Sequence, residues 1–299
     1  MSKVYTDPRH YADIADAIRA KNGLTDTYKP SEMPAAIRAI ETGGETEPLS
    51  VTANGTYYPP AGVDGFSPVT VRVSGSETPY SDSMRDLLVL WYDGIENAGE
   101  GIHDPTATTW TDLSGNGNDG TITDGTWASD HLVFNGSTTW VNCGRQDLPV
   151  LTLEVVVMHN SAQSSGESDS VAGNWQSGGY GIQLKDGKYV SQIYLSGWKA
   201  VNGDDVELAS VKVLTVTFDG TICRFFEDGV ETDSLSVRGA VSSPSRSTVL
   251  SIGSNPNGSA IGITPLDGNI YSARLYNAGL PPDTVAGLYS EVISRFTDV

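Results

Sequence analysis

The stretch "LTVTFDGTICRFFEDGVETDSL", residues 214–235, decides the fold class. Threonine, valine and phenylalanine recur in it, and these β-branched and aromatic residues favour extended strands. Asp219-Gly220 and Asp228-Gly229 interrupt the runs, and Asp-Gly pairs favour the tight turns of β-hairpins. The stretch therefore predicts antiparallel strands that follow one another through short turns.

The same pattern continues through most of the chain after Leu87. Apolar or alternating runs lie at residues 87–92, 131–134, 139–142, 151–158, 180–184, 188–195, 211–218, 222–227, 248–252 and 268–276. Turn pairs separate them, among them Asn135-Gly136, Asp186-Gly187 and Asn257-Gly258. Many short strands without intervening helices predict an all-β, two-sheet sandwich.

One helix is expected near the C-terminus, over residues 284–296. Pro281-Pro282-Asp283 opens it, because proline is tolerated in the first helical turn. An apolar stripe runs along the segment and predicts that one helix face packs on the sandwich. Its members are Val285, Leu288, Tyr289 and Ile293.

The chain is predicted to have three parts. Residues 1–43 form a helical hairpin, residues 44–80 form a small β module with linkers, and residues 81–299 form the sandwich. In the β module, residues 49–52 and 69–73 favour short strands. Asn54-Gly55 is a strong turn signal there.

The predicted hairpin has two short helices with apolar faces. Asp7 before Pro8 caps the first helix, Gly23 ends it, and Ser31 caps the second. Helices of this length are marginal in water alone, so their apolar faces need a partner. Two interpretations stay open: the hairpin packs on its own large domain, or it docks on another protein.

The formal net charge of the chain is −19. An acidic surface repels nucleic acids and anionic membranes, so we expect neither as a partner. The first residues lack the apolar core of a signal peptide, and no stretch reaches transmembrane length, so synthesis in a cytoplasm is expected. Cys143 and Cys223 do not form a disulfide framework; buried free thiols are the default, and a single bridge stays open.

Three separated motifs resemble one known family. They are "LWYDGIENAG…TTWTDLSGNGNDGTI…LVFNGSTTWVNCG" (residues 90–144), "LTVTFDGTICRFFEDGVETDSL" and "LDGNIYSARLYNAGLPPDTVAGLYS" (residues 266–290). In this order they resemble the concanavalin A-like lectin/glucanase domains of the laminin-G type. The resemblance implies a jelly roll of two curved sheets with a lectin-like role.

The N-terminal segments resemble a second group. The hairpin and "NGTYYPPAGVDGFSPVTVRV" (residues 54–73) are similar to segments at the start of structural proteins of tailed bacteriophages of Gram-positive hosts. This implies a virion protein, made in the host cytoplasm, that joins other virion proteins through residues 1–43 and is a homo-oligomer, with a trimer as the first guess. The expected role is a tail fibre or baseplate-associated receptor-binding protein that attaches to a host cell-surface glycan. The alternatives are a capsid-decorating head fibre or other structural protein, and a glycan hydrolase.

Catalysis is not expected. Glycosidases of this class carry paired carboxylates at a set spacing, whereas Glu154 is the only carboxylate in "LTLEVVVM". Glu227, Asp228 and Glu231 surround a turn, where turn chemistry explains them. The four histidines show no metal or triad pattern; they are His10, His103, His131 and His159.

One loop has residues that suit calcium. "DLSGNGNDG", residues 112–120, places side-chain oxygens on a glycine-rich segment, as Ca²⁺ sites do. The alternative is a plain turn that uses asparagine and glycine for left-handed backbone. The candidate ligands are Asp112, Asn116, Asn118 and Asp119.

The tryptophans divide into two groups. Trp91, Trp110 and Trp140 lie in strand-like runs and are expected in the core. Two others lie in polar, glycine-rich loops, where an aromatic ring either stacks on a sugar or caps the end of the sandwich. The candidate carbohydrate-binding residues are Trp175, Tyr180, Trp198, Asn174, Gln176, Asn255 and Asn257.

Overall fold

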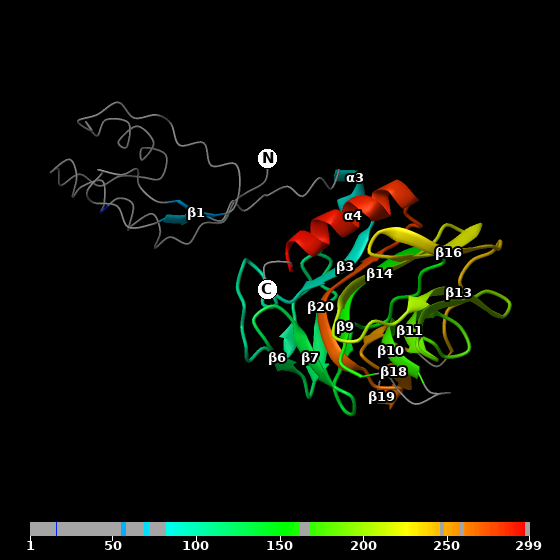
Figure 1. The fold of residues 1–299 in the computed structure, drawn as a ribbon, viewed down its shortest axis with the longest axis horizontal. Coiled ribbons are helices and arrows are strands. Elements are labelled where there is room, and N and C mark those ends of the chain that lie inside the picture. The colour runs from blue at the N-terminus through cyan, green and yellow to red at the C-terminus, as the bar shows by residue number, and fades with distance from the viewer. Residues whose placement is uncertain are drawn as a thin grey trace. The chain divides into compact units, whose positions relative to one another are not determined.

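The computed structural model describes residues 16, 55–57, 69–71, 82–161, 168–245, 248–257 and 260–296. The chain divides into two compact units, Met1–Ser76 and Glu77–Val299. The predicted helical hairpin lies outside the described residues, apart from Asp16, which is helical. Figure 1 shows both units.

The first unit contains one small antiparallel pair of strands. β1 (Gly55–Tyr57) pairs with β2 (Val69–Val71), with Thr56 opposite Thr70. Residues 69–71 of the expected strand at 69–73 are therefore found as a strand. The other expected strand, at residues 49–52, and Asn54 of the expected Asn54-Gly55 turn lie outside the described residues, whereas Gly55 begins β1 and pairs with Val71.

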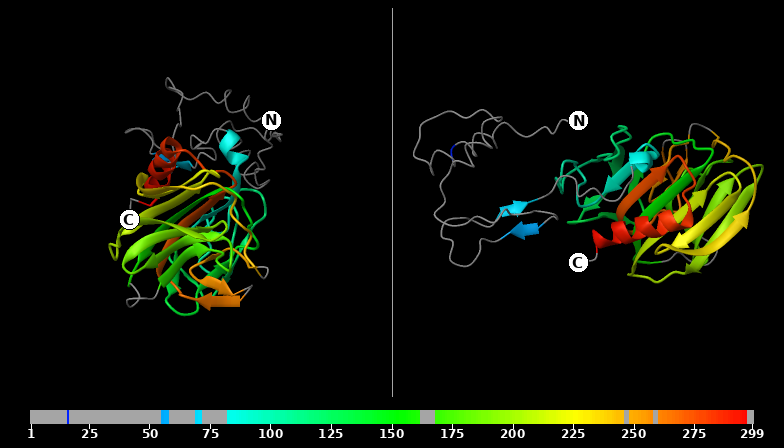
Figure 2. Two further views of the ribbon diagram at one scale, coloured as in Figure 1. Left: turned by 90° about the vertical axis from the view of Figure 1, so that its right-hand side faces the viewer. Right: turned by 90° about the horizontal axis from the view of Figure 1, so that it is seen from above.

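The second unit is a sandwich of two antiparallel sheets (Figures 1 and 2), as the sequence predicts. We call them the back sheet and the front sheet. The back sheet runs in the order β16 (Val230–Ser236), β15 (Ile222–Glu227), β14 (Val211–Phe218), β9 (Leu151–His159), β20 (Asp267–Tyr276), β7 (Leu132–Asn135) and β6 (Thr126–Trp127), and β3 (Leu88–Asp93) also pairs with β20. The front sheet runs in the order β13 (Trp198–Asp205), β12 (Lys188–Tyr194), β11 (Tyr180–Lys185), β10 (Ser168–Gly173), β17 (Ser251–Ile252), β8 (Trp140–Asn142), β5 (Gly120–Thr123) and β4 (Thr109–Trp110).

Three short elements complete this unit. β18 (Asn255–Asn257) and β19 (Ala260–Ile263) form a separate two-stranded ribbon. α3 (Asp82–Arg85) precedes β3.

No helix among the described residues combines the length and apolar character that crossing a bilayer needs.

The core lies between the inner faces of the two sheets. Trp110 is fully buried, stacks on Tyr92 at 5.4 Å and meets Trp127 edge-on at 5.0 Å, measured between ring centroids. Aromatic pairs at this spacing stabilise a core beyond the area they bury. Cys143 and Cys223 are buried free thiols, so the bridge left open by the sequence is not formed.

α4 (Pro282–Ser294) covers the outer face of the back sheet (Figures 1 and 2). Val292 and Phe296 pack against Val156, Val213 and Tyr271 of the strands below. This cover explains why β9 does not alternate between apolar and polar residues: both of its faces are buried.

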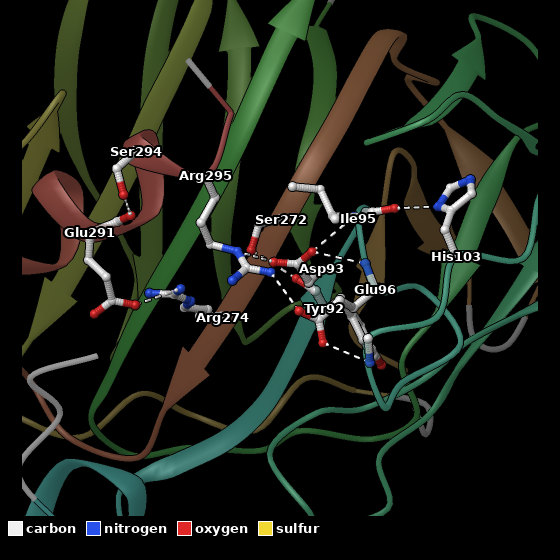
Figure 3. A network of polar contacts seen from close by, with 12 residues as sticks. Tyr92, Asp93, Ile95, Glu96, His103, Ser272, Arg274, Glu291, Ser294 and Arg295 are labelled. Atoms are coloured by element: carbon white, nitrogen blue, oxygen red, sulfur yellow. Dashed lines mark hydrogen bonds and ion pairs between the residues drawn. The ribbon is translucent and has the colours of Figure 1, made fainter. Parts of the chain in front are cut away.

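Two arginines fix α4 to the sheet (Figure 3). Arg295, just after the helix, pairs with the buried Asp93 at 2.8 Å and with Glu96 at 3.1 Å. Arg274 of β20 pairs with Glu291 of the helix at 3.2 Å. In one pair the cation belongs to the sheet and the carboxylate to the helix, and in the others the cation follows the helix and the carboxylates follow or belong to β3.

Candidate functional site

Two of the predicted sugar-binding aromatics are buried. Trp175 is 7% exposed and Tyr180 is fully buried. The Tyr180 hydroxyl donates to the Gln146 carbonyl oxygen at 3.0 Å, and the Asn174 side chain donates to the same oxygen at 3.0 Å. The expectation that these side chains are exposed is therefore wrong, because Tyr180 begins strand β11 and Asn174 holds the turn before it.

The Trp175 ring packs against two glycines of the front sheet. Gly173 and Gly181 are neighbours in register on β10 and β11, and a Cβ at Gly173 would approach the Trp175 ring to 2.9 Å. A Cβ at Gly181 would overlap the same ring. Only glycine at both positions allows the indole to lie against the backbone of the front sheet. Gln176 follows and accepts bonds from Ser245 through its carbonyl oxygen.

Trp198 is exposed, unlike Trp175 and Tyr180. It is 42% exposed at the start of β13, directly opposite Tyr194 of β12. The two rings meet edge-on, with centroids 5.0 Å apart. This pair gives the front sheet an aromatic surface that solvent reaches.

The strand register places polar groups beside this aromatic pair. Side chains at alternate positions of β11 and β12 enter the core, among them Ile182 and Ile193, so Gln183 and Gln192 point to the outer face. The Gln183 amide donates to Gln192 Oε1 at 3.1 Å. Both glutamine side chains are partly exposed. We name Gln183, Gln192, Tyr194 and Trp198 the front patch.

The front patch was only partly predictable. Trp198 was identified from its polar, glycine-rich surroundings, whereas Gln183, Gln192 and Tyr194 were missed. In β12, Tyr189, Ser191 and Ile193 are buried, and the residues between them lie on the other face of the strand. This alternation is the signal that could have identified Gln192 and Tyr194. Asn255 and Asn257 belong to β18, which is not part of β11–β13, and the Asn257 side chain lies outside the described residues.

The predicted calcium loop is a hydrogen-bonded turn. Asp112 accepts bonds from the backbone N–H groups of Trp91, Ser114 and Asn118 at 2.9 Å each. Asp119 accepts from the Asp112 N–H at 2.8 Å. These carboxylates therefore shape the loop, which is the alternative that the sequence left open.

The two asparagines of this loop are also engaged. Asn116 donates to the Leu88 carbonyl oxygen at 2.7 Å, and Asn118 donates to that of Val89 at 2.8 Å. Across the described ranges, no group of three or more His, Cys, Asp or Glu side chains is arranged to hold a metal ion. Calcium binding at this loop stays a prediction.

The carboxylates considered for catalysis lie apart from the front patch. Glu154 is 1% exposed beneath α4, where its Oε1 lies 3.6 Å from Arg274 Nη1. Burial raises the pKa of Glu154 to about 7. Glu227 accepts from the Asp204 N–H at 2.7 Å, and burial raises its pKa as well.

The fold and the outer-face aromatics define a lectin-like β-sandwich. Residues 135–286 match the family model described as the concanavalin A-like lectin/glucanases superfamily. The chain therefore belongs to this superfamily, which confirms the resemblance read from its motifs. No curated protein sequence matches it significantly.

Solved structures share the fold at low sequence identity. A Trypanosoma rangeli sialidase in complex with sialic acid is 15% identical, with a TM-score of 0.52 over 71% of this chain and 34% of that one. Domain 4 of the arabinanase AbnA from Geobacillus stearothermophilus, in complex with arabinotriose, is 19% identical, with a TM-score of 0.53 over 68% of this chain and 98% of that one.

A third similar structure is the binding domain of botulinum neurotoxin serotype D. It is 12% identical, with a TM-score of 0.55 over 72% of this chain and 54% of that one. The chain thus spans about a third of the sialidase and about half of the toxin domain. Identities this low establish the shared fold alone.

Proposed function

We propose that the second unit is a carbohydrate-binding domain whose ligand lies on the front patch. The observation that carries the proposal is the exposed Trp198–Tyr194 pair beside the Gln183–Gln192 amides. Aromatic rings stack on the apolar faces of sugars, and amides exchange hydrogen bonds with sugar hydroxyls. The similar arabinanase domain holds arabinotriose, which agrees with this use of the fold.

The front patch supports binding without hydrolysis. Gln183 and Gln192 are amides and cannot serve as the acid and base that glycoside cleavage requires. Glu154 lies beneath α4, remote from any ligand on the front sheet. A glycan hydrolase stays the alternative that an assay for released reducing ends tests.

We further propose that the whole protein is an adhesin of a tailed-bacteriophage virion. In this proposal residues 1–43 join other virion proteins and the sandwich attaches to a host cell-surface glycan, as the resemblance of the N-terminal segments implies. A tail fibre or baseplate location fits that role better than a capsid location. One aromatic stack contributes about 0.5–1.5 kcal/mol, so several copies, a trimer in the first instance, supply avidity.

The test is glycan binding by the full chain displayed on beads, against bacterial wall polysaccharides. Trp198→Ala and Gln192→Ala should each reduce bead adhesion severalfold without lowering the melting temperature. Val230→Ala is the matched control, because Val230 is 67% exposed on β16 of the back sheet. If the parent binds no glycan, the structural-protein alternative replaces the proposal; if both variants bind like the parent, the front patch is not the site.

A further inference from the structure

Strand β13, which carries Trp198 of the front patch, is an edge strand of the front sheet. It pairs with β12 on one side only, so the backbone groups on its other side have no ladder partner. Strands β15 and β16 of the back sheet lie against β13 (Figure 1). Their side chains are therefore placed to bind the free edge of β13.

A β-bulge interrupts the pairing of β13 with β12. Asn202 lies opposite Val190 and Asp205 lies opposite Lys188, so β13 has one more residue than β12 in this interval. A bulge disrupts the ladder locally and bends the strand that contains it. Within the bulge, the N–H of residue 204 donates to the carboxylate of residue 227 on β15, at 2.7 Å.

Gly203 makes room for this bond. A Cβ at position 203 would overlap Glu227 Oε1, and it would lie 2.8 Å from the Phe225 ring. Glu227 is 8% exposed, so its carboxylate lies largely within the protein, against the edge of β13. Only glycine at position 203 allows the carboxylate to reach the Asp204 N–H.

Strand β16 has a bulge of its own where it meets β13. Asp233 pairs with Phe225 and Glu231 pairs with Phe226, so Thr232 is an extra residue on β16. Bulges re-aim the side chains of the strand that contains them. Here the two residues at the bulge, Thr232 and Asp233, contact the backbone of β13.

Asn202 receives both contacts from the β16 bulge. Its N–H donates to Asp233 Oδ2 at 2.9 Å, and its carbonyl oxygen accepts from the Thr232 hydroxyl at 3.3 Å. Asp233 is itself held in place, because its Oδ1 accepts from the Ser234 N–H at 2.8 Å. Two carboxylates of the back sheet thus hold the backbone of β13 at neighbouring points.

We propose that Glu227 and Asp233 are positioning residues of the front patch. They hold a mostly exposed edge strand against the back sheet, and this fixes the register that sets Trp198 opposite Tyr194. Asn202 lies four residues from Trp198, about 13 Å along the strand, so the carboxylates act through the β13 backbone. Their role depends on the proposed binding of a glycan at the front patch, and neither carboxylate contacts the glycan.

The first test follows β13 in the full chain without a glycan, through hydrogen exchange measured by NMR. Asp233→Ala should speed exchange of the Asn202 amide, and Glu227→Ala should speed exchange of the Asp204 amide, because each amide loses its acceptor. Glu227→Gln keeps an acceptor oxygen in the same place and should exchange like the parent. Unchanged exchange in both alanine variants would overturn the proposal.

The Trp198–Tyr194 contact shows whether the loosened backbone affects the front patch. Nuclear Overhauser effects between the two rings should weaken in Asp233→Ala and Glu227→Ala and stay unchanged in Glu227→Gln. Faster amide exchange with the ring contact intact would also overturn the proposal.

Asp104→Ala is the matched control. Asp104 likewise accepts a backbone N–H, that of Thr106 at 2.8 Å, but it lies in the loop before β4, at the opposite edge of the front sheet. Its removal should leave both the amide exchange of β13 and the Trp198 ring contact unchanged. Equal loosening of β13 in this control would show a general loss of stability and contradict the positioning role.

Glycan adhesion in the bead assay is the second test. Asp233→Ala and Glu227→Ala should weaken adhesion severalfold, whereas Glu227→Gln and Asp104→Ala should adhere like the parent. Full adhesion by alanine variants whose β13 amides exchange faster would overturn the proposal. If the parent itself binds no glycan, the proposed function fails, while amide exchange and the ring contact still decide whether the two carboxylates position β13.

Discussion

Glu154 illustrates, at the scale of a single residue, how position decides chemical role. It shares Arg274 with Glu291 in a buried site beneath α4. Figure 3 shows the contact between Arg274 and Glu291. Two carboxylates and one guanidinium leave a net negative charge in a dry environment when both acids ionise. Burial is the main cause of the raised pKa of Glu154, the Arg274 charge opposes it, and the Glu291 charge adds to it.

The first prediction concerns the pH dependence of stability. The Glu154 pKa rises from its ordinary 4.5 to about 7 on folding, so the folded protein holds a proton that the unfolded chain releases between these values. The free energy of unfolding should therefore fall by about 3 kcal/mol as the pH rises from 4.5 to 7 on account of this group. Glu154→Gln cannot ionise and should lose this dependence, as measured by urea unfolding across the pH range.

His159 also makes the stability of the parent protein depend on pH, so the effect of Glu154 must be read from the difference between parent and variant. Burial lowers the pKa of His159 to about 4, so its contribution to stability grows as the pH rises from about 4 to 6.5 and opposes that of Glu154. It is unchanged in Glu154→Gln, and the difference between parent and variant isolates Glu154. Glu100→Gln, at an exposed glutamate, is the control. Parallel curves for parent and Glu154→Gln would contradict the assignment.

At the scale of elements, α4 depends on its polar anchors as well as its apolar face. The predicted apolar stripe of Val285, Leu288, Tyr289 and Ile293 is right for Val285 and Leu288, which are buried. Val292, which the stripe did not include, is fully buried in place of Ile293. The Arg295–Asp93 pair was not foreseeable, because 202 positions separate the partners. Only the sandwich topology brings β3 beside the end of the helix.

Removing the Arg295 anchor should loosen this helix. Arg295→Ala leaves Asp93, which is fully buried, without its cation, and breaking such a pair costs about 3 kcal/mol. Thermal unfolding and hydrogen exchange of the α4 amides measure the effect. Arg145→Ala removes an exposed pair with Asp147 and should cost about 0–1 kcal/mol. Equal losses in the two variants would refute the anchoring role.

The strands were predictable to different degrees for a physical reason. Residues 211–218 and 222–227 were predicted with the bounds that β14 and β15 have, because apolar runs and the Asp-Gly turns mark both ends. The Asp228-Gly229 turn has positive φ angles of 50° and 77°, as such a hairpin requires. β13 was missed because it is a mostly exposed edge strand with a polar sequence, which carries little periodic signal.

At the scale of the whole molecule, the two sheets have different outer faces. α4 covers the outer face of the back sheet, and the apolar contacts between the two stabilise the fold. The outer face of β11–β13 carries the exposed aromatics and amides instead. The sequence predicted the sandwich and placed both Trp175 and Trp198 in polar loops, of which only Trp198 is exposed. The front patch depends on the strand register that sets Trp198 opposite Tyr194.

The most direct measurement of the central claim is an NMR map of the full chain titrated with a glycan that the bead assay shows to bind. The account predicts that the largest amide and side-chain shifts fall on Gln183, Gln192, Tyr194 and Trp198, with smaller shifts at Trp175. Shifts gathered instead on the 112–120 loop, with the front patch unmoved, would contradict it.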